Sequence, residues 1–141
     1  MYAVIRVRGS VNVAREVKDT LKMLRLTRVN HCVVIPKNPN YEGMLGKAKA
    51  YITWGEITQD SLERLVSKRG RLPGDKRIPE KEAKVIAGKI RKERSLKDAG
   101  IKPVFRLSPP SKGYSSVRIN YPRGDLGNRG ENINELLKRM I

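Results

Sequence analysis

The apolar positions of the first 57 residues switch between the spacing of strands and the spacing of helices. Ala3, Ile5 and Val7 alternate with other side chains at the start, which predicts a half-buried strand. Apolar residues then recur three and four positions apart, as on one face of a helix. The predicted elements are a strand at 2–8, a helix capped by Asn12 with Val13, Val17, Leu21 and Leu24, a strand at 31–35, a helix at 42–49 and a strand at 50–54. This order predicts a compact α+β unit with a β-α-β-α-β core.

The second half of the chain continues with helices and short strands. A helix capped by Thr58 or Asp60 leads into a basic, glycine-containing loop at 68–77, and another helix follows. Short apolar runs at 104–107 and 116–119 predict two strands that face each other as a β-hairpin. The apolar positions of the last two helices are Ala83, Ile86, Ala87 and Ile90 in one, and Ile133, Leu136, Leu137 and Met140 in the other.

Net charge narrows the class of partner. The chain has 31 Lys and Arg against 14 Asp and Glu, a net charge of +17. Residues 1–57, 58–100 and 101–141 carry +6, +6 and +5, so the excess is not confined to a tail. Such like charge destabilises a compact monomer unless a polyanion neutralises it. Nucleic acid is therefore the expected partner, and an anionic membrane surface is second.

Catalytic, metal and membrane chemistry find no support in the sequence. A single cysteine, Cys32, excludes an internal disulfide and a Cys-rich zinc site, and it fits a reducing cytoplasm. Cys32 and the single histidine, His31, are neighbours on a strand, so their side chains point to opposite faces. Arg6 interrupts the first apolar run too early for a signal peptide, and no run approaches the roughly 18 residues of a membrane span. We expect no catalytic residue, cofactor, metal or small-molecule substrate.

The arrangement of the basic residues favours RNA over DNA. They cluster with Gly, Pro and Asn in predicted loops at 37–40, 68–77, 109–114 and 121–130. Such loops can follow an irregular phosphate backbone and read RNA shape. A DNA reader more often concentrates its side chains on one helix for the major groove.

Two features of these loops have more than one interpretation. In the stretch 124–130, backbone amides beside the glycines could approach a phosphate and Arg129 could fork onto it, but a plain surface turn explains the residues as well. Tyr41, Tyr114 and Tyr121 could stack on bases or serve as hydrophobic anchors.

Several spaced motifs resemble one known family. These are Thr20-Leu21-x-x-Leu24-x-Leu26-x-Arg28-x-x-His31-x-Val33, Met44-Leu45-x-x-Ala48-x-x-Tyr51-Ile52, Phe105-Arg106-Leu107-x-Pro109-Pro110, Gly124-Asp125-Leu126-Gly127-x-Arg129-Gly130 and Ile133-Asn134-Glu135-Leu136-Leu137. Together they resemble the large-subunit ribosomal protein L-thirty family in its archaeal type, which is related to eukaryotic ribosomal protein L-seven. The segment 115–122 matches no part of that pattern.

The resemblance implies a division of the chain and a place in the cell. Residues 1–57 resemble the complete bacterial form, a three-stranded sheet with two helices on one face (ferredoxin-like), and 58–141 resemble an archaeal-type extension of helices and a hairpin. The family implies a noncatalytic protein of the cytoplasmic ribosome that binds large-subunit ribosomal RNA and neighbouring large-subunit proteins, partly through loops at 37–40 and 46–49.

The resemblance and the basic loops together give the expected RNA contacts. These residues are Arg8, Arg28, His31, Lys37, Asn38, Lys47, Lys49, Arg69, Arg71, Lys76, Arg77, Arg106, Lys112, Arg123 and Arg129. The alternatives from other classes are an RNA-processing or RNA-modifying factor and a basic DNA-compacting protein.

Overall fold

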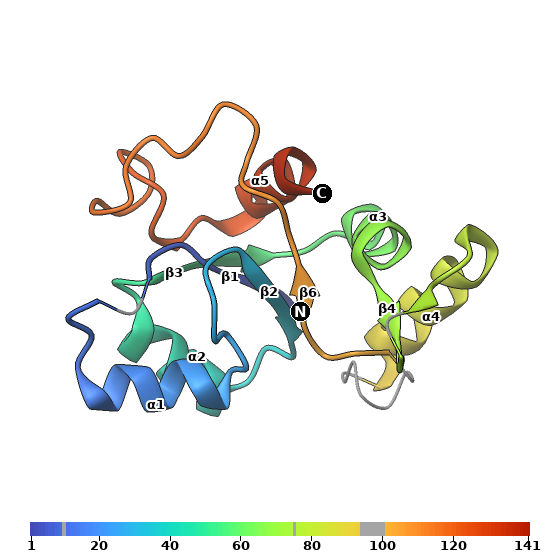
Figure 1. Ribbon diagram of the computed structural model, residues 1–141, viewed down its shortest axis with the longest axis horizontal. Helices are drawn as coiled ribbons and strands as arrows, with labels where there is room; N and C mark the ends of the chain where they lie inside the picture. The colour runs from blue at the N-terminus through green and yellow to red at the C-terminus, as the bar shows by residue number, and fades with distance from the viewer. Residues whose placement is uncertain (10, 75, 94–100) are drawn as a thin grey trace.

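A five-stranded sheet with helices on both sides organises the computed structural model, which describes residues 1–9, 11–74, 76–93 and 101–141 (Figure 1). The strands of the sheet are β1 (Tyr2–Arg6), β2 (His31–Ile35), β3 (Ile52–Glu56), β6 (Phe105–Arg106) and β7 (Gly127–Asn128). Their order is β6-β2-β1-β3-β7, and only the edge pair β3–β7 within this order is parallel. The α+β class and the three predicted core strands are confirmed, with one short strand added at each edge.

Two helices cover one face of the sheet, as the family resemblance implied. They are α1 (Arg15–Met23) and α2 (Pro39–Ala48), which lie side by side below the sheet (Figure 1). Val4 and Val33 from the strands pack there against Leu21 and Leu45 from the helices. The β-α-β-α-β unit therefore has its own apolar layer on this side.

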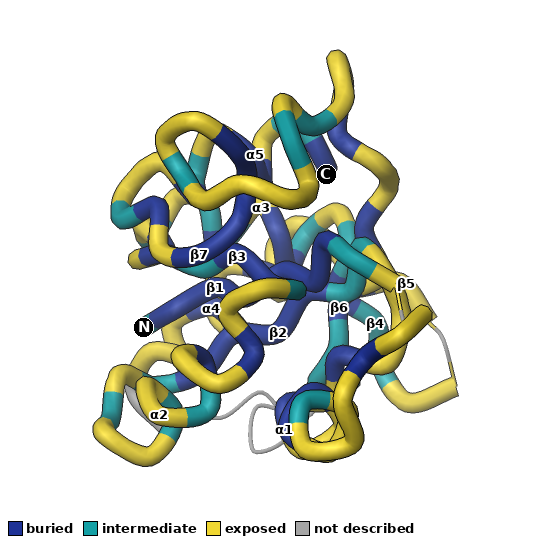
Figure 2. The backbone as a smooth tube through the Cα atoms, turned by 90° about the vertical axis from the view of Figure 1, so that its left-hand side faces the viewer, coloured by how far each residue is buried: buried dark blue, intermediate teal, exposed yellow. Residues whose placement is uncertain are grey.

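The remaining helices bury the opposite face. They are α3 (Gln59–Arg69), α4 (Glu80–Glu93) and α5 (Ile133–Met140), which follows a single 3-10 turn, η1 (Gly130–Asn132). Ala3 and Ile5 of β1 pack on this side with Leu62 of α3 and Leu136 of α5. The prediction that β1 is half-buried is wrong, because the second half of the chain covers the face that the first half would leave in water (Figure 2).

Arg6 shows how completely β1 is enclosed. Its side chain is 3% exposed, and its guanidinium donates from Nη1 to the carbonyl oxygen of Leu26 at 2.7 Å and from Nε to that of Arg8 at 2.9 Å. A buried cation that binds backbone carbonyls in this way is a structural group.

Helix starts differ from the sequence prediction by a few residues. α1 begins after Ala14, whose side chain makes no capping hydrogen bond, while Asn12 has a left-handed φ of 56° outside the helix. α2 begins at Pro39, earlier than predicted, because Oδ1 of Asn38 accepts from the backbone N–H of Tyr41 at 2.9 Å. Of the two caps proposed for α3, Thr58 is the one used.

The predicted hairpin of 104–107 with 116–119 is wrong. β6 pairs instead with β2, so that Phe105 lies opposite Cys32 and is fully buried. The 116–119 segment forms no strand, and Ile119 is 51% exposed. A two-stranded hairpin does occur in the second half, but it lies in the basic loop, where β4 (Arg71–Leu72) pairs with β5 (Lys76–Arg77).

Candidate nucleic-acid interface

A cavity of about 500 Å³ opens where the two halves of the chain meet, and we call it the junction pocket. Thr27, Pro103 and Val104 form part of its wall, and the described residues that line it include no acidic side chain. Its basic lining side chains are Arg25, His31, Arg69, Arg71, Lys102 and Arg106. Four of these were predicted as RNA contacts, whereas Arg25 and Lys102 were not.

Regular backbone structure brings the pocket residues together. Arg69 ends α3 and Arg71 opens β4 two residues later. The backbone N–H of Lys102 donates to the carbonyl oxygen of Arg71 at 2.8 Å, which joins the segment before β6 to the hairpin. On the other wall, His31 of β2 lies directly opposite Arg106 of β6. The pocket is therefore held by secondary structure from both halves.

The electrostatic field in the pocket is positive. The pKa of His31 is lowered, first by burial and then by the positive charges of Arg106, Arg28 and Arg6. Its Nδ1 atom is buried and has no hydrogen-bond partner among the described residues. A neutral imidazole surrounded by cations marks a place where an anion would be attracted.

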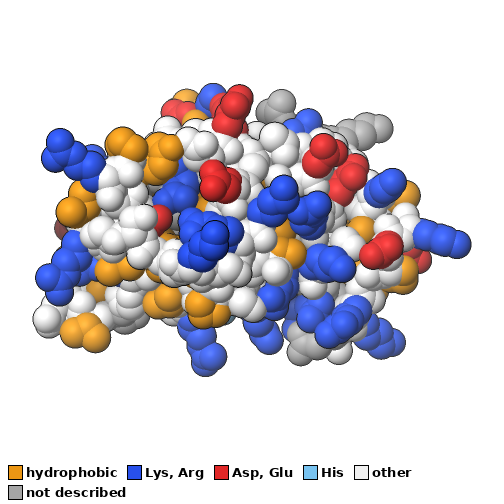
Figure 3. Space-filling view, turned by 90° about the horizontal axis from the view of Figure 1, so that it is seen from above, with side chains coloured by type: hydrophobic (Ala, Val, Ile, Leu, Met, Phe, Trp, Pro, Cys, Tyr) orange, Lys and Arg blue, Asp and Glu red, His pale blue; other side chains and the backbone are white. Residues whose placement is uncertain are grey.

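Other cavities lined by described residues each include acidic side chains, such as Asp60, Asp125 and Glu135. On the face seen from above, Lys and Arg side chains are spread out, with Asp and Glu side chains between them (Figure 3). Net charge alone therefore explains attraction to a polyanion, but the acid-free lining is what distinguishes the junction pocket.

The RNA contacts predicted within residues 1–57 lie at the surface, and their side chains have different partners. Lys37 donates from Nζ to Oε1 of Glu56 at 2.8 Å, and Lys47 lies 3.8 Å from Oε2 of Glu16. These pairs are exposed and screened by solvent, so a phosphate can compete with them. Arg8 is half-buried and places its guanidinium over the ring of Tyr51.

The remaining predicted contacts are spread over the surface. Arg28, Lys49, Lys76, Arg77, Lys112 and Arg123 are exposed. Lys76 and Arg77 form β5, which places them on the same hairpin as Arg71 of the pocket. The hairpin therefore extends the basic surface outward from the junction.

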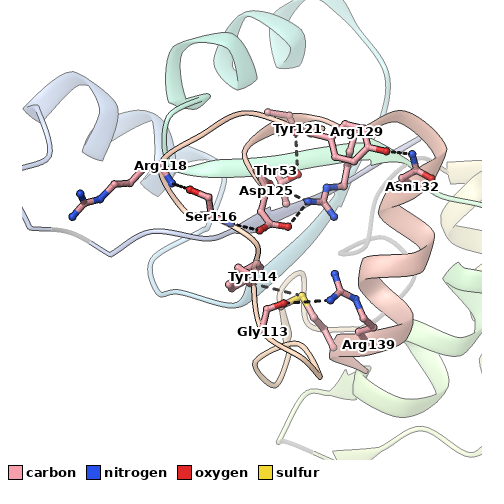
Figure 4. Close-up of polar contacts among 12 residues, drawn as sticks. Thr53, Gly113, Tyr114, Ser116, Arg118, Tyr121, Asp125, Arg129, Asn132 and Arg139 are labelled. Carbon is pink, nitrogen blue, oxygen red and sulfur yellow. Dashed lines mark hydrogen bonds and ion pairs between the residues drawn. The ribbon is translucent and has the colours of Figure 1, made fainter. Parts of the chain in front are cut away.

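Arg129 is directed inward in the structure (Figure 4). Its Nη2 atom donates to Oδ1 of Asp125 at 2.8 Å and to the Asp125 backbone carbonyl at 3.3 Å. The second carboxylate oxygen, Oδ2, accepts from the backbone N–H of Ser116 at 3.0 Å. The loop at 124–130 is thus built around an internal ion pair, and the segment 115–122 supplies part of the cradle for its carboxylate.

The three loop tyrosines make internal contacts. Tyr114 donates from its hydroxyl to Oδ1 of Asn30 at 3.0 Å and packs against the core. Tyr121 lies under the guanidinium of Arg129 and accepts a hydrogen bond from the Asn132 amide. Tyr41 is half-buried against the α1–α2 side of the sheet. These positions correspond to the anchor interpretation.

Sequence reasoning missed Arg25, Thr27 and Lys102 for a common reason. They lie outside the predicted basic loops, and they line the pocket together with His31 and Arg106, which are partners in the β2–β6 pairing. Arg25 follows Leu24, the C-cap residue of α1, and has a left-handed φ of 63°, which the helical spacing of the sequence does not show.

The known proteins that this chain resembles are proteins of the large ribosomal subunit. The family model described as ribosomal protein L30p/L7e matches residues 2–52. The chain is 49% identical to the large ribosomal subunit protein uL30 of Methanosphaera stadtmanae, with 100% of both chains covered. It is 50% and 46% identical to the proteins of the same name from Methanococcus maripaludis and Archaeoglobus fulgidus, with 99% of each chain covered. This chain therefore belongs to the ribosomal protein L30p/L7e family, in its archaeal form.

Proposed function

We propose that this chain is held in the large ribosomal subunit by phosphate contacts with ribosomal RNA, made by both halves of the chain. Membership of the family makes it a structural, non-enzymatic constituent of that subunit. Neighbouring large-subunit proteins are the second class of partner. The comparisons support neither the RNA-processing nor the DNA-compacting alternative. Within the described ranges, no helix is long and apolar enough to cross a bilayer.

The junction pocket is the observation that carries this proposal. Six basic side chains converge there, and no acid among the described lining residues balances them. Guanidinium groups form short, charge-assisted hydrogen bonds with phosphate oxygens, and each neutralised phosphate releases counterions. The pocket is thus suited to a polyanion whose charges are regularly spaced along a backbone.

Exposed bases beyond the pocket extend the same chemistry. Lys47 lies near the end of α2 and Lys49 follows it, and both side chains are exposed on the core. Lys76 and Arg77 are likewise exposed on the β4–β5 hairpin of the extension. We infer that these four side chains contact further phosphates of the same RNA.

We further infer that the two halves divide the work. Residues 1–57 would specify the RNA site, which is supported by a family match confined to residues 2–52. Residues 58–141 would add anchorage, since phosphate contacts from loops and hairpins carry little sequence information.

Chemical footprinting on large-subunit ribosomal RNA tests the proposal. Three full-length variants are compared with the wild-type protein. The core variant changes Lys37, Lys47 and Lys49 to Gln, and the extension variant changes Arg69, Arg71, Lys76 and Arg77 to Gln. The control variant changes Lys81, Lys84, Lys89 and Lys138, which are exposed on α4 and α5, to Gln.

Each variant has its own expected result. The extension variant should need more protein for the same protection while keeping the same protected nucleotides. The core variant should lose or shift protection, and the control variant should bind like the wild type. If the extension variant loses the site and the core variant keeps it, the division of labour is reversed. If no variant differs from the control, phosphate contact by these residues is refuted.

A further inference from the structure

We propose that the junction pocket holds one phosphate group of the RNA backbone and that His31 is one of the ligands. This inference rests on the proposed function and adds to it a defined site, a ligand class and a titratable reporter. Nothing in the family match or in the relatives assigns a role to this cavity.

The chemistry of the lining suits a phosphate oxyanion. Four guanidinium groups, one ammonium group and one imidazole meet around a cavity of about 500 Å³, and the Thr27 hydroxyl adds a neutral donor. All of these groups can donate hydrogen bonds, and phosphate offers oxygens that accept several at once. An apolar ligand would offer these donors no acceptor, and a cationic ligand would be repelled.

The two facing strands would place like charges against each other if the His31 imidazole were protonated. His31 and Arg106 are direct cross-strand partners in the β2–β6 pairing. Like charges in that position are destabilising, so protonation of the imidazole is unfavourable in the free protein. A phosphate between the two groups would turn the repulsion into two attractive contacts.

The described charged groups that shift the pKa of His31 all carry positive charge. Arg6 on β1, Arg28 on the turn before β2 and Arg106 on β6 all lower its pKa, after burial as the largest cause. The pocket adds Arg25, Arg69, Arg71 and Lys102 from the end of α1, from α3, from β4 and from the segment before β6. A bound phosphate brings negative charge close to the imidazole, so it should raise the pKa of His31.

The pocket is also ordered in advance of binding. Arg69 donates from Nη2 to Oγ of Ser108 at 2.6 Å, and Arg71 donates from Nη1 to the carbonyl oxygen of Gly70 at 3.1 Å. These bonds fix the two side chains on the hairpin side of the pocket. Side chains already ordered lose less entropy when the anion arrives than side chains on a mobile loop would.

His31 is the single histidine of the chain, so its imidazole proton resonances report on this pocket alone. We would titrate pH by NMR in full-length protein with inorganic phosphate, with chloride at equal ionic strength, and with a short RNA from the footprinted region. Phosphate and RNA should each raise the pKa of His31 by about one pH unit or more, and the increase should saturate with ligand concentration. Chloride should not raise it.

Two matched variants separate the pocket from general charge. Arg71→Gln with Arg106→Gln removes two pocket cations, and the rise in the pKa of His31 should disappear. Arg15→Gln with Lys18→Gln removes two exposed cations from α1, and the rise should persist. Backbone spectra of both double variants establish that each is folded before the titrations are compared.

The outcomes distinguish this inference from the proposed function. If RNA binds and the pKa of His31 does not respond, the pocket assignment is overturned while the RNA-binding function stands. If phosphate raises the pKa and bound RNA does not, the site takes free anions and the backbone assignment is overturned. If the RNA does not bind even at low salt, the proposed function itself fails.

Discussion

Nη2 of Arg129 and Oδ1 of Asp125 lie 2.8 Å apart, and each side chain is 5% exposed. The pair connects the glycine-rich loop at 124–130 to Ser116, whose backbone N–H donates to the same carboxylate. The backbone N–H of Arg129 also donates to the carbonyl oxygen of Trp54 in β3 at 2.9 Å. Residues distant in sequence are thus tied to the edge of the sheet through one ion pair.

We expect Arg129→Met to destabilise the protein by about 3–5 kcal/mol, because it leaves the Asp125 carboxylate buried without its counter-charge. Urea unfolding of the wild type and the variant measures the difference. Arg118→Met is the control, since Arg118 is exposed and the hydrogen bond recorded for it uses its backbone N–H. Adding Asp125→Asn to Arg129→Met should recover much of the loss. A change below about 0.5 kcal/mol for Arg129→Met would contradict this account.

Removing the extension should leave the core unable to fold alone. A fragment of residues 1–57 would expose the sheet face that carries Ala3, Ile5, Cys32 and Val34, which is buried in the full chain. At this size a single core is marginal even when it is complete. Circular dichroism and sedimentation should show an unfolded or aggregated fragment. Cooperative unfolding of a monomeric fragment would mean that α1 and α2 suffice.

The sequence predicts the helices and the central strands of this fold better than the short strands at the edges of the sheet. Helical spacing identifies the buried residues of the last helix, and Ile133, Leu136, Leu137 and Met140 are all fully buried. Alternation along 2–8 identifies a strand but cannot show that its second face is covered, because the covering helices come from the other half of the chain. Short strands are the hardest to predict, since a strand of two residues such as 105–106 specifies its pairing partner only weakly.

The sequence predicts a basic surface for RNA, but it does not predict which basic residues come together in the fold. The basic loop at 68–77 indicates Arg69 and Arg71 directly, and both line the junction pocket. Arg25 and Lys102 line the same pocket although both lie outside the predicted basic loops. Arg129 lies in a glycine-rich loop and has the guanidinium group expected of a phosphate ligand. Its internal partner is Asp125, which the sequence alone does not show.

The stability of the protein should fall in alkali partly through Tyr114. Burial, and then the Asp125 carboxylate, raise the pKa of Tyr114 to about 12, against the two opposing charges of Arg129 and Arg139. An unfolded tyrosine titrates near 10, so the folded state binds this proton more tightly. The stabilisation is therefore complete below about pH 10 and is lost as pH rises through about 12.

Comparison with Tyr114→Phe isolates this effect. The variant loses the hydrogen bond to Asn30, which contributes about 1 kcal/mol, but has no phenol to ionise. The advantage of the wild type over the variant in urea unfolding should be smaller at about pH 11 than at about pH 8. An equal advantage at both pH values would show that this phenol does not couple to folding.

Cys32 should be unreactive in the folded protein. Its side chain is fully buried, and burial raises the pKa of the thiol, so almost no thiolate is present at neutral pH. Alkylation should be slow in native buffer and fast in denaturant, as measured by mass spectrometry. Cys32→Ala should cost about 1 kcal/mol through lost packing. Rapid alkylation of the native protein would contradict the burial of this strand.

The salt dependence of RNA binding tests the central claim most directly. Affinity for a large-subunit ribosomal RNA fragment is measured over a range of salt concentrations and plotted on logarithmic axes. The wild type should show a steep slope, and neutralising Arg69, Arg71, Lys76 and Arg77 should lower its magnitude by about one for each true phosphate contact. Neutralising Lys81, Lys84, Lys89 and Lys138 should leave the slope nearly unchanged. A wild-type affinity that hardly responds to salt, or an equal flattening in both variants, would contradict the account.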